Sequence, residues 1–333
     1  MAAQTRVELG DIYAARRRIA GVARRTPLIA SPALAARAGG EVRLKLEFLQ
    51  DTGSFKVRGA ANTILSLDDK ARAKGVVTVS TGNHGRAVAH VARLAGVKAA
   101  VCLSNLVPEN KRAAIRALGA ELVVHGQSQD DAAEIAFARV REAGMTMVNP
   151  FDDARVVTGQ GTIGIELLED WPEIDVAVVP LSGGGLVSGI ACALKAARAG
   201  CRVVAISMDR GAAMHASIAA GKPVQIPDVD SLADSLQGGI FLDNKITFAM
   251  VRELVDEIVL VTEEEIARGM AYAFDRDHLA LEGAAAVGYA AILAGKLDVK
   301  GQRAALVLSG TNVASGTLAE IVAKHRDWLR GEA

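Results

Sequence analysis

The chain has 333 residues, of which half are hydrophobic, 33 are glycine and only 4% are aromatic. Lysine plus arginine equals aspartate plus glutamate at 38 each, so the chain lacks the basic excess that nucleic-acid-binding proteins usually carry. The three cysteines are odd in number and have no metal-type spacing, which argues against a secreted disulfide framework. The N-terminus lacks the apolar core of a signal peptide, and no apolar run reaches the roughly 20 residues that span a bilayer. We therefore expect a soluble, cytoplasmic protein that binds neither nucleic acid nor membrane.

A lysine between apolar residues is the first unusual feature along the chain. The segment "DTGSFKVRGA" (51–60) places Lys56 between Phe55 and Val57. One interpretation is a lysine at the end of a strand whose ammonium group stays in water at the tip of its carbon stem. The other is a desolvated amine with a lowered pKa, which can act as a nucleophile. These ten residues alone leave both interpretations open.

Short β-branched runs then alternate with longer alanine-rich segments. The predicted strands are 75–80, 98–104, 121–126 and 145–150, followed by 175–181, 201–207, 256–262 and 303–310. The predicted helices are 84–96, 108–120, 128–144, 186–199 and 263–275. Strand and helix alternating at this pitch indicate right-handed crossovers and parallel strands. The predicted fold class is α/β, with open, twisted parallel sheets flanked by helices.

Three turns that follow predicted strands carry the candidate binding groups. They are "STGNHG" (80–85), "LSGGGLVSG" (181–189) and "LSGTNVASG" (308–316). Ligands of open parallel sheets bind beyond the carboxyl ends of the strands, so these turns can line one crevice. The glycines of the second turn lack Cβ atoms and let backbone N–H groups converge on an anion at the start of a helix. Their GxGxxxG spacing favours a single phosphate over a dinucleotide, and a tight turn without a ligand is the alternative.

The other two turns suit a carboxylate and a neutral hydrogen-bonding partner. Unpaired N–H groups and the helix dipole after "STGNHG" favour negative charge, although Asn83 could simply cap its helix. Ser309 in "LSGTNV" offers a hydroxyl at a strand end, with a local turn bond as the alternative. An amine, an anion cradle, a carboxylate loop and a neutral hydroxyl are the groups that pyridoxal phosphate chemistry uses.

The four motifs together carry a family resemblance. "GSFKVRGA", "STGNHG", "SGGGL" and "LSGTNV" occur in the order and approximate spacing of fold-type II pyridoxal-phosphate enzymes of the serine/threonine dehydratase and serine racemase group. The chain resembles this family over nearly its whole length. The resemblance implies a tryptophan synthase β-like fold and a homodimer. It also implies a small, mobile, substrate-closing domain at 51–149, and a large cofactor-binding domain built from 1–50 and 150–333.

The resemblance also implies a role for individual residues. Lys56 forms the Schiff base with pyridoxal phosphate, Asn83 bonds the phenolic oxygen of the ring, and Ser309 faces the ring nitrogen. The full implied cofactor-binding set is Phe55, Lys56, Asn83, Gly183, Gly184, Gly185, Leu186, Glu282 and Ser309. The implied substrate-binding set is Ser80, Thr81, Gly82, His84 and Ser235. Lys56 and Thr81 are the predicted catalytic residues.

The reaction implied is the elimination of a β-hydroxyl group from an amino acid, which gives a 2-keto acid and ammonia. Lys56 acts as the general base at Cα. Ser207, Ala212 and Ala213 replace the carboxylates of a divalent-metal site found in some relatives, so we expect no metal. Ser235, where the wider family usually has glycine, adds to a likeness to hydroxyectoine-utilisation dehydratases. The expected substrate is a β-hydroxy α-amino acid similar to threonine or serine, or a product of hydroxyectoine breakdown.

Three alternative functions share much of this evidence. An amino-acid racemase acting on serine or aspartate uses the same cofactor residues, but it needs a proton donor on the face opposite Lys56. A β-replacement synthase has the same scaffold with a different carboxylate loop. A non-catalytic ligand-binding α/β protein is disfavoured because Lys56 and all the motif turns are intact.

Overall fold

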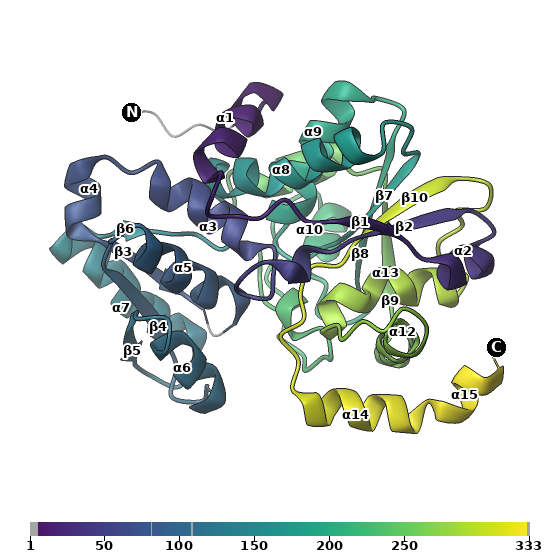
Figure 1. Ribbon diagram of the computed structural model, residues 1–333. Helices are drawn as coiled ribbons and strands as arrows, with labels where there is room; N and C mark the ends of the chain where they lie inside the picture. Colours follow the sequence, from purple (N-terminus) through teal and green to yellow (C-terminus); the bar gives the residue numbers. More distant parts are fainter. Residues whose placement is uncertain (1–5, 81, 108, 332–333) are drawn as a thin grey trace.

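The computed structural model describes residues 6–80, 82–107 and 109–331, which form two sheets side by side (Figure 1). The six-stranded sheet has the order β1-β2-β10-β7-β8-β9, and all of its neighbouring strands are parallel except the edge pair β1–β2. Its strands are β1 (Leu28–Ala30), β2 (Glu41–Lys45), β7 (Val176–Pro180), β8 (Arg202–Met208), β9 (Glu257–Val261) and β10 (Arg303–Val307). The predicted α/β fold with parallel sheets is confirmed.

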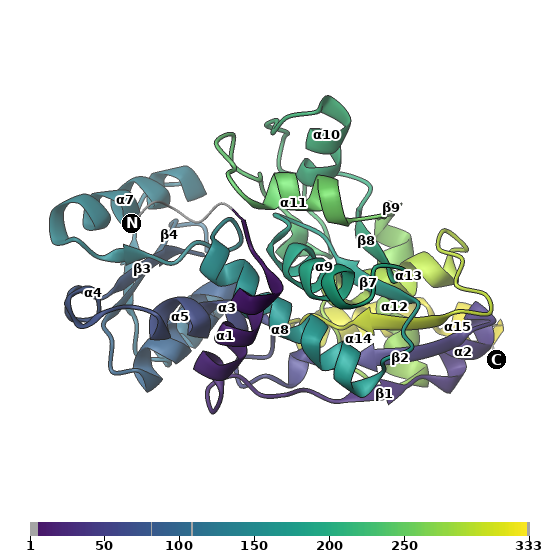
Figure 2. The same cartoon turned by 90° about the horizontal axis from the view of Figure 1, so that it is seen from above.

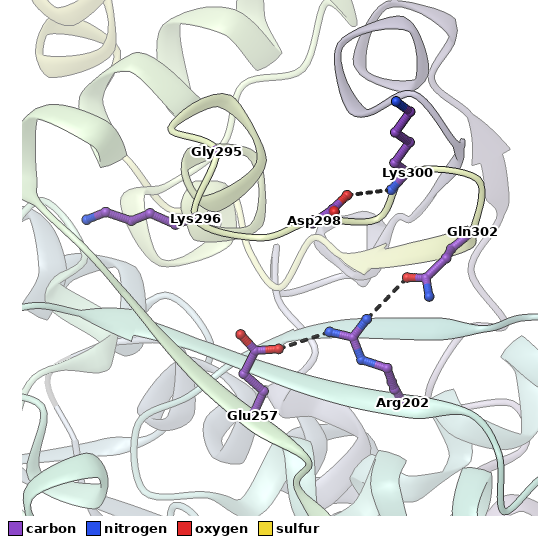
Figure 3. Close-up of a pocket in the computed structure, with 7 residues that line it drawn as sticks. All are labelled: Arg202, Glu257, Gly295, Lys296, Asp298, Lys300 and Gln302. Atoms are coloured by element: carbon purple, nitrogen blue, oxygen red, sulfur yellow. Dashed lines mark hydrogen bonds and ion pairs between the residues drawn. The ribbon is translucent and has the colours of Figure 1, made fainter.

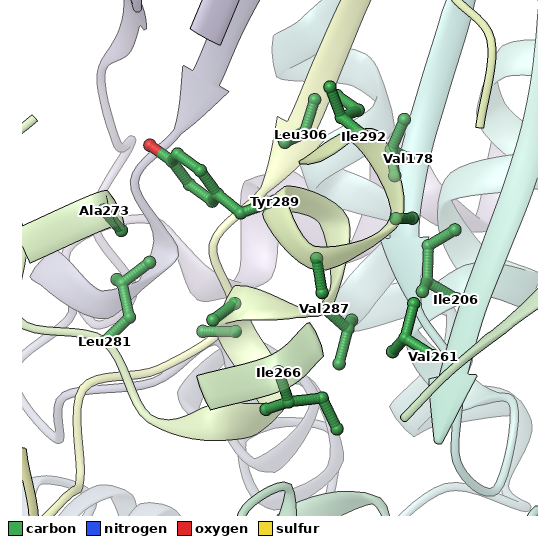
Figure 4. Packing of buried hydrophobic residues seen from close by; sticks show 14 of the residues in the cluster. Val178, Ile206, Val261, Ile266, Ala273, Leu281, Val287, Tyr289, Ile292 and Leu306 are labelled. Atoms are coloured by element: carbon green, nitrogen blue, oxygen red, sulfur yellow. The ribbon is translucent and has the colours of Figure 1, made fainter. Parts of the chain in front are cut away.

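The large sheet is buried on both faces, which explains its nearly continuous apolar strands. Val178, Ile206 and Leu306 belong to the core on one face, where α13 (Gly283–Leu293) packs against the sheet and α12 (Glu263–Arg276) packs on α13 (Figure 4). The alternate residues, such as Ala177 and Ala305, belong to the core on the other face. There α9 (Gly185–Ala197) lies against the sheet and α8 (Ala154–Asp170) lies against α9.

The second sheet has four parallel strands in the order β5-β4-β3-β6. These strands are β3 (Val76–Val79), β4 (Ala99–Leu103), β5 (Glu121–Val124) and β6 (Thr146–Met147). Its helices are α5 (Asn83–Leu94), α6 (Glu109–Arg116) and α7 (Gln129–Ala143). Val77 and Cys102 pack with α7, whereas Val101 and Leu103 pack with α5 and α6 on the opposite face. The four strands predicted between 75 and 150 are therefore present, in shortened form.

The remaining elements cover the edges and join the sheets. The α-helices are α1 (Leu9–Ile19), α2 (Pro32–Ala38), α3 (Lys56–Leu65), α4 (Asp69–Lys74), α10 (Ala213–Ala220), α11 (Thr247–Leu254), α14 (Ser315–Lys324) and α15 (Arg326–Gly331). Two short 3₁₀ turns are η1 (Glu47–Leu49) and η2 (Asp234–Leu236). In both overall views α3 lies between the two sheets (Figures 1 and 2). Within the described ranges, no helix has the length and apolarity needed to cross a membrane.

Helix α3 is fixed against the large sheet by a close helix crossing and a buried charge cluster. A Cβ on Gly159 would lie 2.6 Å from the carbonyl of Arg58, so this position requires glycine, and one on Gly59 would lie 2.5 Å from the side chain of Gln160. Arg58 is buried and donates to both carboxylate oxygens of Glu47 at 2.8 Å, and to those of Glu166 at 2.6 and 2.9 Å. Because Lys56 precedes Arg58 by two residues, these contacts also fix the start of α3.

Candidate active site

The site lies where the strand order of each sheet reverses. In the small sheet β3 has β4 on one side and β6 on the other, and in the large sheet β7 lies between β8 and β10. Loops at such reversal points diverge and leave a crevice beyond the carboxyl ends of the strands. The two reversal points face each other: Asn83, after β3, accepts a hydrogen bond from Asn312, after β10, at 2.5 Å. Lys56 reaches the loop after β6, where it donates to the carbonyl of Pro150 at 2.8 Å.

Lys56 is the first residue of α3 and its amine is desolvated. The amine lies 5.3 Å from the centre of the Phe55 ring, and only part of the side chain remains accessible. Burial lowers the pKa of Lys56 to about 8, although the negative charge of Glu282 acts in the opposite direction. An amine with this pKa is neutral in roughly a tenth of molecules at pH 7, so it can serve as nucleophile and base. The interpretation of Lys56 as a strand-end lysine with its head in water is wrong.

The glycine loop joins β7 to α9 and excludes side chains. Gly184 caps α9 in the left-handed conformation, with φ at +88°. A Cβ on Gly183 would lie 2.4 Å from the ring of Phe151, and one on Gly185 would lie 2.9 Å from its Cα. Leu186 turns its side chain into the core. The three glycines at the start of α9 have no side chains of their own, so their backbone N–H groups can approach an anion closely.

Asn83 and Glu282 form the centre of a hydrogen-bond network. Asn83 is the first residue of α5 and donates to Glu282 at 2.8 Å and to the hydroxyl of Ser235 at 3.3 Å. The backbone N–H of Asn312 donates to the second oxygen of Glu282 at 3.1 Å. A Cβ on Gly310 would lie 2.4 Å from Glu282, so glycine is needed beside the carboxylate. The structure thus brings three of the predicted residues together from distant parts of the chain.

His84 is held as a neutral ring beside this network. Its Nε2–H donates to the carbonyl of Val148 at 2.9 Å. Burial, followed by the nearby charge of Lys56, lowers the pKa of His84 to about 3, so the imidazole stays uncharged at physiological pH. Its Nδ1 atom is buried and has no hydrogen-bond partner among the residues that the structure describes. His84 can therefore accept a hydrogen bond from a bound molecule.

The remaining predicted residues lie in the loops that border this network. The hydroxyl of Ser80 accepts a hydrogen bond from the N–H of Gly82 at 3.3 Å, and the space beside the Gly82 Cα is open. Ser309 is buried, and its carbonyl accepts a hydrogen bond from the N–H of Phe55 at 3.1 Å, which brings the strand end next to the lysine. Thr81 lies outside the described residues.

Three residues of the site were not singled out from the sequence. Asn312 contacts Asn83 and Glu282, and its Oδ1 accepts a hydrogen bond from Arg86 at 2.6 Å. Asn312 belongs to the "LSGTNV" motif and Arg86 directly follows "STGNHG", so the motifs held a signal for both. Phe151, which packs on the glycine loop, had no such signal.

Comparison with known proteins identifies the family. The family described as pyridoxal-phosphate dependent enzyme matches residues 19–310. The chain belongs to this family. Among curated relatives, a Sinorhizobium fredii protein provisionally named a threonine dehydratase is 48% identical, and the alignment covers 95% of each chain. The L-threonine ammonia-lyase of Thermotoga maritima is 39% identical over 96% of this chain and 79% of its own.

Solved structures of family members show the same fold. Maize serine racemase superposes with a TM-score of 0.90 at 33% identity, and the match covers 97% of this chain and 99% of the racemase. Membership of the family gives pyridoxal phosphate as the cofactor. The superposition shows that the fold is that of the dehydratase and racemase group.

The residues present fit this cofactor. The Lys56 amine can form a covalent bond with an aldehyde, and the glycine loop provides a cradle for a phosphate. The buried Oγ of Ser54 and Nε of Arg86, like Nδ1 of His84, have no partner among the described residues. A polar molecule bound beside these atoms would complete their hydrogen bonding.

A pocket of about 380 Å³ lies away from this chemistry (Figure 3). It is bounded by Arg202, Glu257 and Gln302 at the amino ends of β8, β9 and β10, opposite the ends that carry the site. Arg202 is already paired with Glu257 at 2.9 Å.

The described ranges contain no group of three or more His, Cys, Asp or Glu side chains arranged to hold a metal ion.

Proposed function

We propose that the protein is a pyridoxal-phosphate-dependent ammonia-lyase that converts a β-hydroxy α-amino acid into a 2-keto acid and ammonia. The observation that carries this proposal is the desolvated amine of Lys56, which contacts the loop after β6 and lies beside His84 of the loop after β3 and Ser309 of the segment after β10. Curated relatives at 37–48% identity that bear threonine dehydratase or ammonia-lyase names support it.

The cofactor would be held by residues of both sheets. Lys56 would bind it covalently, with Phe55 beside the ring and Asn83 and Glu282 at its polar edge. Gly183, Gly184, Gly185 and Leu186 would bind the phosphate through backbone N–H groups, and Ser309 would face the ring nitrogen. When bound, pyridoxal phosphate withdraws electrons from the substrate amino acid, which makes the Cα proton acidic and helps a β-substituent to leave.

The protein residues would then control the proton and the substrate. The neutral amine of Lys56 takes the proton from Cα, because its lowered pKa leaves a free lone pair near neutral pH. Ser80, Gly82 and neutral His84 surround the substrate carboxylate, together with Thr81. Ser309 is uncharged and does not hold the ring nitrogen protonated as a carboxylate would. Negative charge at Cα is therefore stabilised less, which favours prompt loss of the β-hydroxyl.

A racemase function is the second candidate, because serine racemase shares the fold at 33% identity. Racemisation needs a proton donor on the face opposite Lys56, and Thr81 is the predicted residue for this role. The extra methyl group of threonine restricts its side chain compared with serine, which favours elimination. Chiral analysis of unreacted L-serine distinguishes the two functions. Accumulation of D-serine faster than pyruvate would contradict the lyase assignment.

We propose that the substrate is a β-hydroxy α-amino acid that is larger or more polar than serine. Ser235 hydrogen-bonds to Asn83 and contacts Asp234 at 3.3 Å, so a polar pair borders the network. Asp234 could pair with a second ammonium group, as in a hydroxylated diaminobutyrate formed from hydroxyectoine. We also propose a cytoplasmic homodimer in which residues 51–149 close over the substrate. In that closure α3 would stay with the large sheet, because its crossing with α8 is tight.

The decisive experiment incubates purified protein and pyridoxal phosphate with threonine, serine, 3-hydroxyaspartate and 3-hydroxy-2,4-diaminobutyrate. The products measured are keto acid and ammonia, which we expect in equal amounts. Lys56→Ala is the matched control and should form neither product, nor an adduct that borohydride reduces. Wild-type protein that binds pyridoxal phosphate but releases no ammonia from any of the four would overturn the lyase assignment.

A further inference from the structure

Phe241 has a backbone conformation that bulky residues avoid. Its φ is +64°, in the left-handed region, and among the described non-glycine residues only His278 shares a positive φ. This conformation brings Cβ close to the following carbonyl oxygen, so it is unfavourable for any residue except glycine. Surrounding contacts must therefore hold Phe241 in place.

The contact that holds Phe241 is an aromatic stack on Phe151. The two ring centres are 4.7 Å apart and the planes are inclined by 18°. Phe241 nevertheless remains 46% exposed, so it gains only part of the benefit of burying an aromatic ring. The stabilisation from such a stack is of the same order as the unfavourable backbone energy. Folding stability alone gives little reason for a phenylalanine at this position.

Phe151 connects the stack to the glycine loop. A Cβ on Gly183 would lie 2.4 to 2.6 Å from three adjacent ring atoms of Phe151, which places this glycine over one face of the ring. Phe241 stacks in near-parallel fashion and so takes the other face. Phe151 is therefore held between the glycine loop and Phe241.

The opposite side of the loop is tied back to the same segment. A Cβ on Gly184 would lie 3.1 Å from Thr247 at the start of α11. The carboxylate of Asp152, the neighbour of Phe151, accepts from the N–H of Thr247 at 3.0 Å. Asn244 donates to the hydroxyl of Thr247 and to the carbonyl of Ile240, both at 2.8 Å. A closed ring of contacts thus runs from Phe241 through Phe151, the loop and α11 back to residue 240.

We propose that Phe241 is a positioning residue that clamps the glycine loop through Phe151 and so holds its N–H groups ready for the cofactor phosphate. This proposal rests on the proposed function, because it assigns the loop to pyridoxal phosphate. A pre-organised loop binds more tightly because less ordering is needed when the ligand arrives. The strained backbone is retained because the ring acts on cofactor binding.

The test separates the ring from the backbone strain. Phe241→Ala removes the ring and keeps the strain, Phe241→Gly removes both, and Phe241→Tyr keeps both. Leu242→Ala, at the adjacent residue with 65% exposure, is the matched control. The melting temperature of each apoprotein is measured, and the Kd for pyridoxal phosphate is measured by absorbance titration. Neither readout depends on turnover.

We expect Phe241→Ala and Phe241→Gly to raise the Kd about three- to tenfold, from the size of an aromatic pair interaction. Phe241→Tyr and Leu242→Ala should stay within about twofold of wild type. The apoprotein of Phe241→Gly should melt at or above the wild-type temperature, because its strain is relieved, and that of Phe241→Ala should melt below it. Unchanged Kd values in the Ala and Gly variants, with normal binding by wild type, would overturn the clamp alone. Wild-type protein that binds no pyridoxal phosphate would overturn the proposed function and the clamp together.

Discussion

Replacing Arg58 by methionine should destabilise the fold strongly, because buried carboxylates then lose the cation that pairs with them. Arg58 is 1% exposed and Glu47 is completely buried. Removing one partner of a buried ion pair costs about 3–5 kcal/mol. Lys45 still neutralises Glu166 at 2.6 Å, and Thr26 still donates to Glu47, so we expect the lower end, about 3 kcal/mol.

The pH dependence of this loss provides a second check. Burial alone would raise the pKa of Glu166, but Arg58 and Lys45 outweigh it and hold that pKa below the ordinary value. In wild type this stabilisation is complete above the ordinary pKa of a glutamate and is lost as the pH falls through the lowered value. In the variant, protonation of a buried carboxylate that has lost its partner removes an unpaired charge and stabilises the folded state. The difference between variant and wild type should therefore shrink from pH 8 to pH 5.

Urea unfolding of the apoprotein, followed by circular dichroism, measures both effects. The double variant Arg58→Met/Glu47→Gln also removes the unpaired charge of Glu47. It should recover about 1–2 kcal/mol of the lost free energy of unfolding. Arg326→Met, on an exposed helix near the end of the chain, is the surface control. A loss below about 1 kcal/mol, or one equal at pH 8 and pH 5, would refute the buried-charge reasoning.

Four further predictions address the site. Reductive methylation of Lys56 in the apoprotein should titrate with a midpoint of about 8, and a midpoint near 10.5 would show that the amine is solvated. Gly183→Ala should weaken pyridoxal phosphate binding at least about tenfold through a clash with Phe151. The control Gly200→Ala, with open space around it, should leave binding unchanged, and equal Kd values for the two variants would contradict the packing argument. Asn312→Ala should lower kcat about tenfold because Asn83 and Arg86 lose their hydrogen bonds to Asn312. Asn105→Ala, at an exposed asparagine, should leave kcat unchanged, and an unaltered kcat in both variants would show that Asn312 does not act in the site. Activity should persist in EDTA, and a collapse that magnesium reverses would reveal a required cation.

The sequence predicted the strands whose apolar character comes from burial on both faces. Runs such as 175–181 and 201–207 are easily recognised because their successive apolar side chains enter one core or the other. Strands β1 and β2 were not predicted. β2 reads "EVRLK", and its closing Lys45 is buried only because Glu166 and Thr26, from other parts of the chain, receive its ammonium group. A local pattern cannot show such a partner.

The residues of the site likewise divide into those that a local sequence pattern predicts and those that depend on distant partners. Lys56 and the glycine loop could be found because each depends on a local requirement, an amine in an apolar setting and a turn without side chains. The side-chain contacts of Asn312 with Arg86, Asn83 and Thr52 could not, because these residues lie 226 to 260 positions away in the sequence. The assignment of individual residues to cofactor and substrate remains a prediction.

The position of β10 has a consequence for the order in which the protein forms during synthesis. The small sheet uses only residues 76–147 and can form as soon as they emerge from the ribosome. The large sheet cannot, because β10 is made last and is inserted between β2 and β7, both made long before. Until then β2 and β7 expose unpaired edges that can pair with other chains. The same late strand brings Ser309 to Phe55, beside Lys56, so a nascent chain cannot complete this part of the site before β10 is inserted.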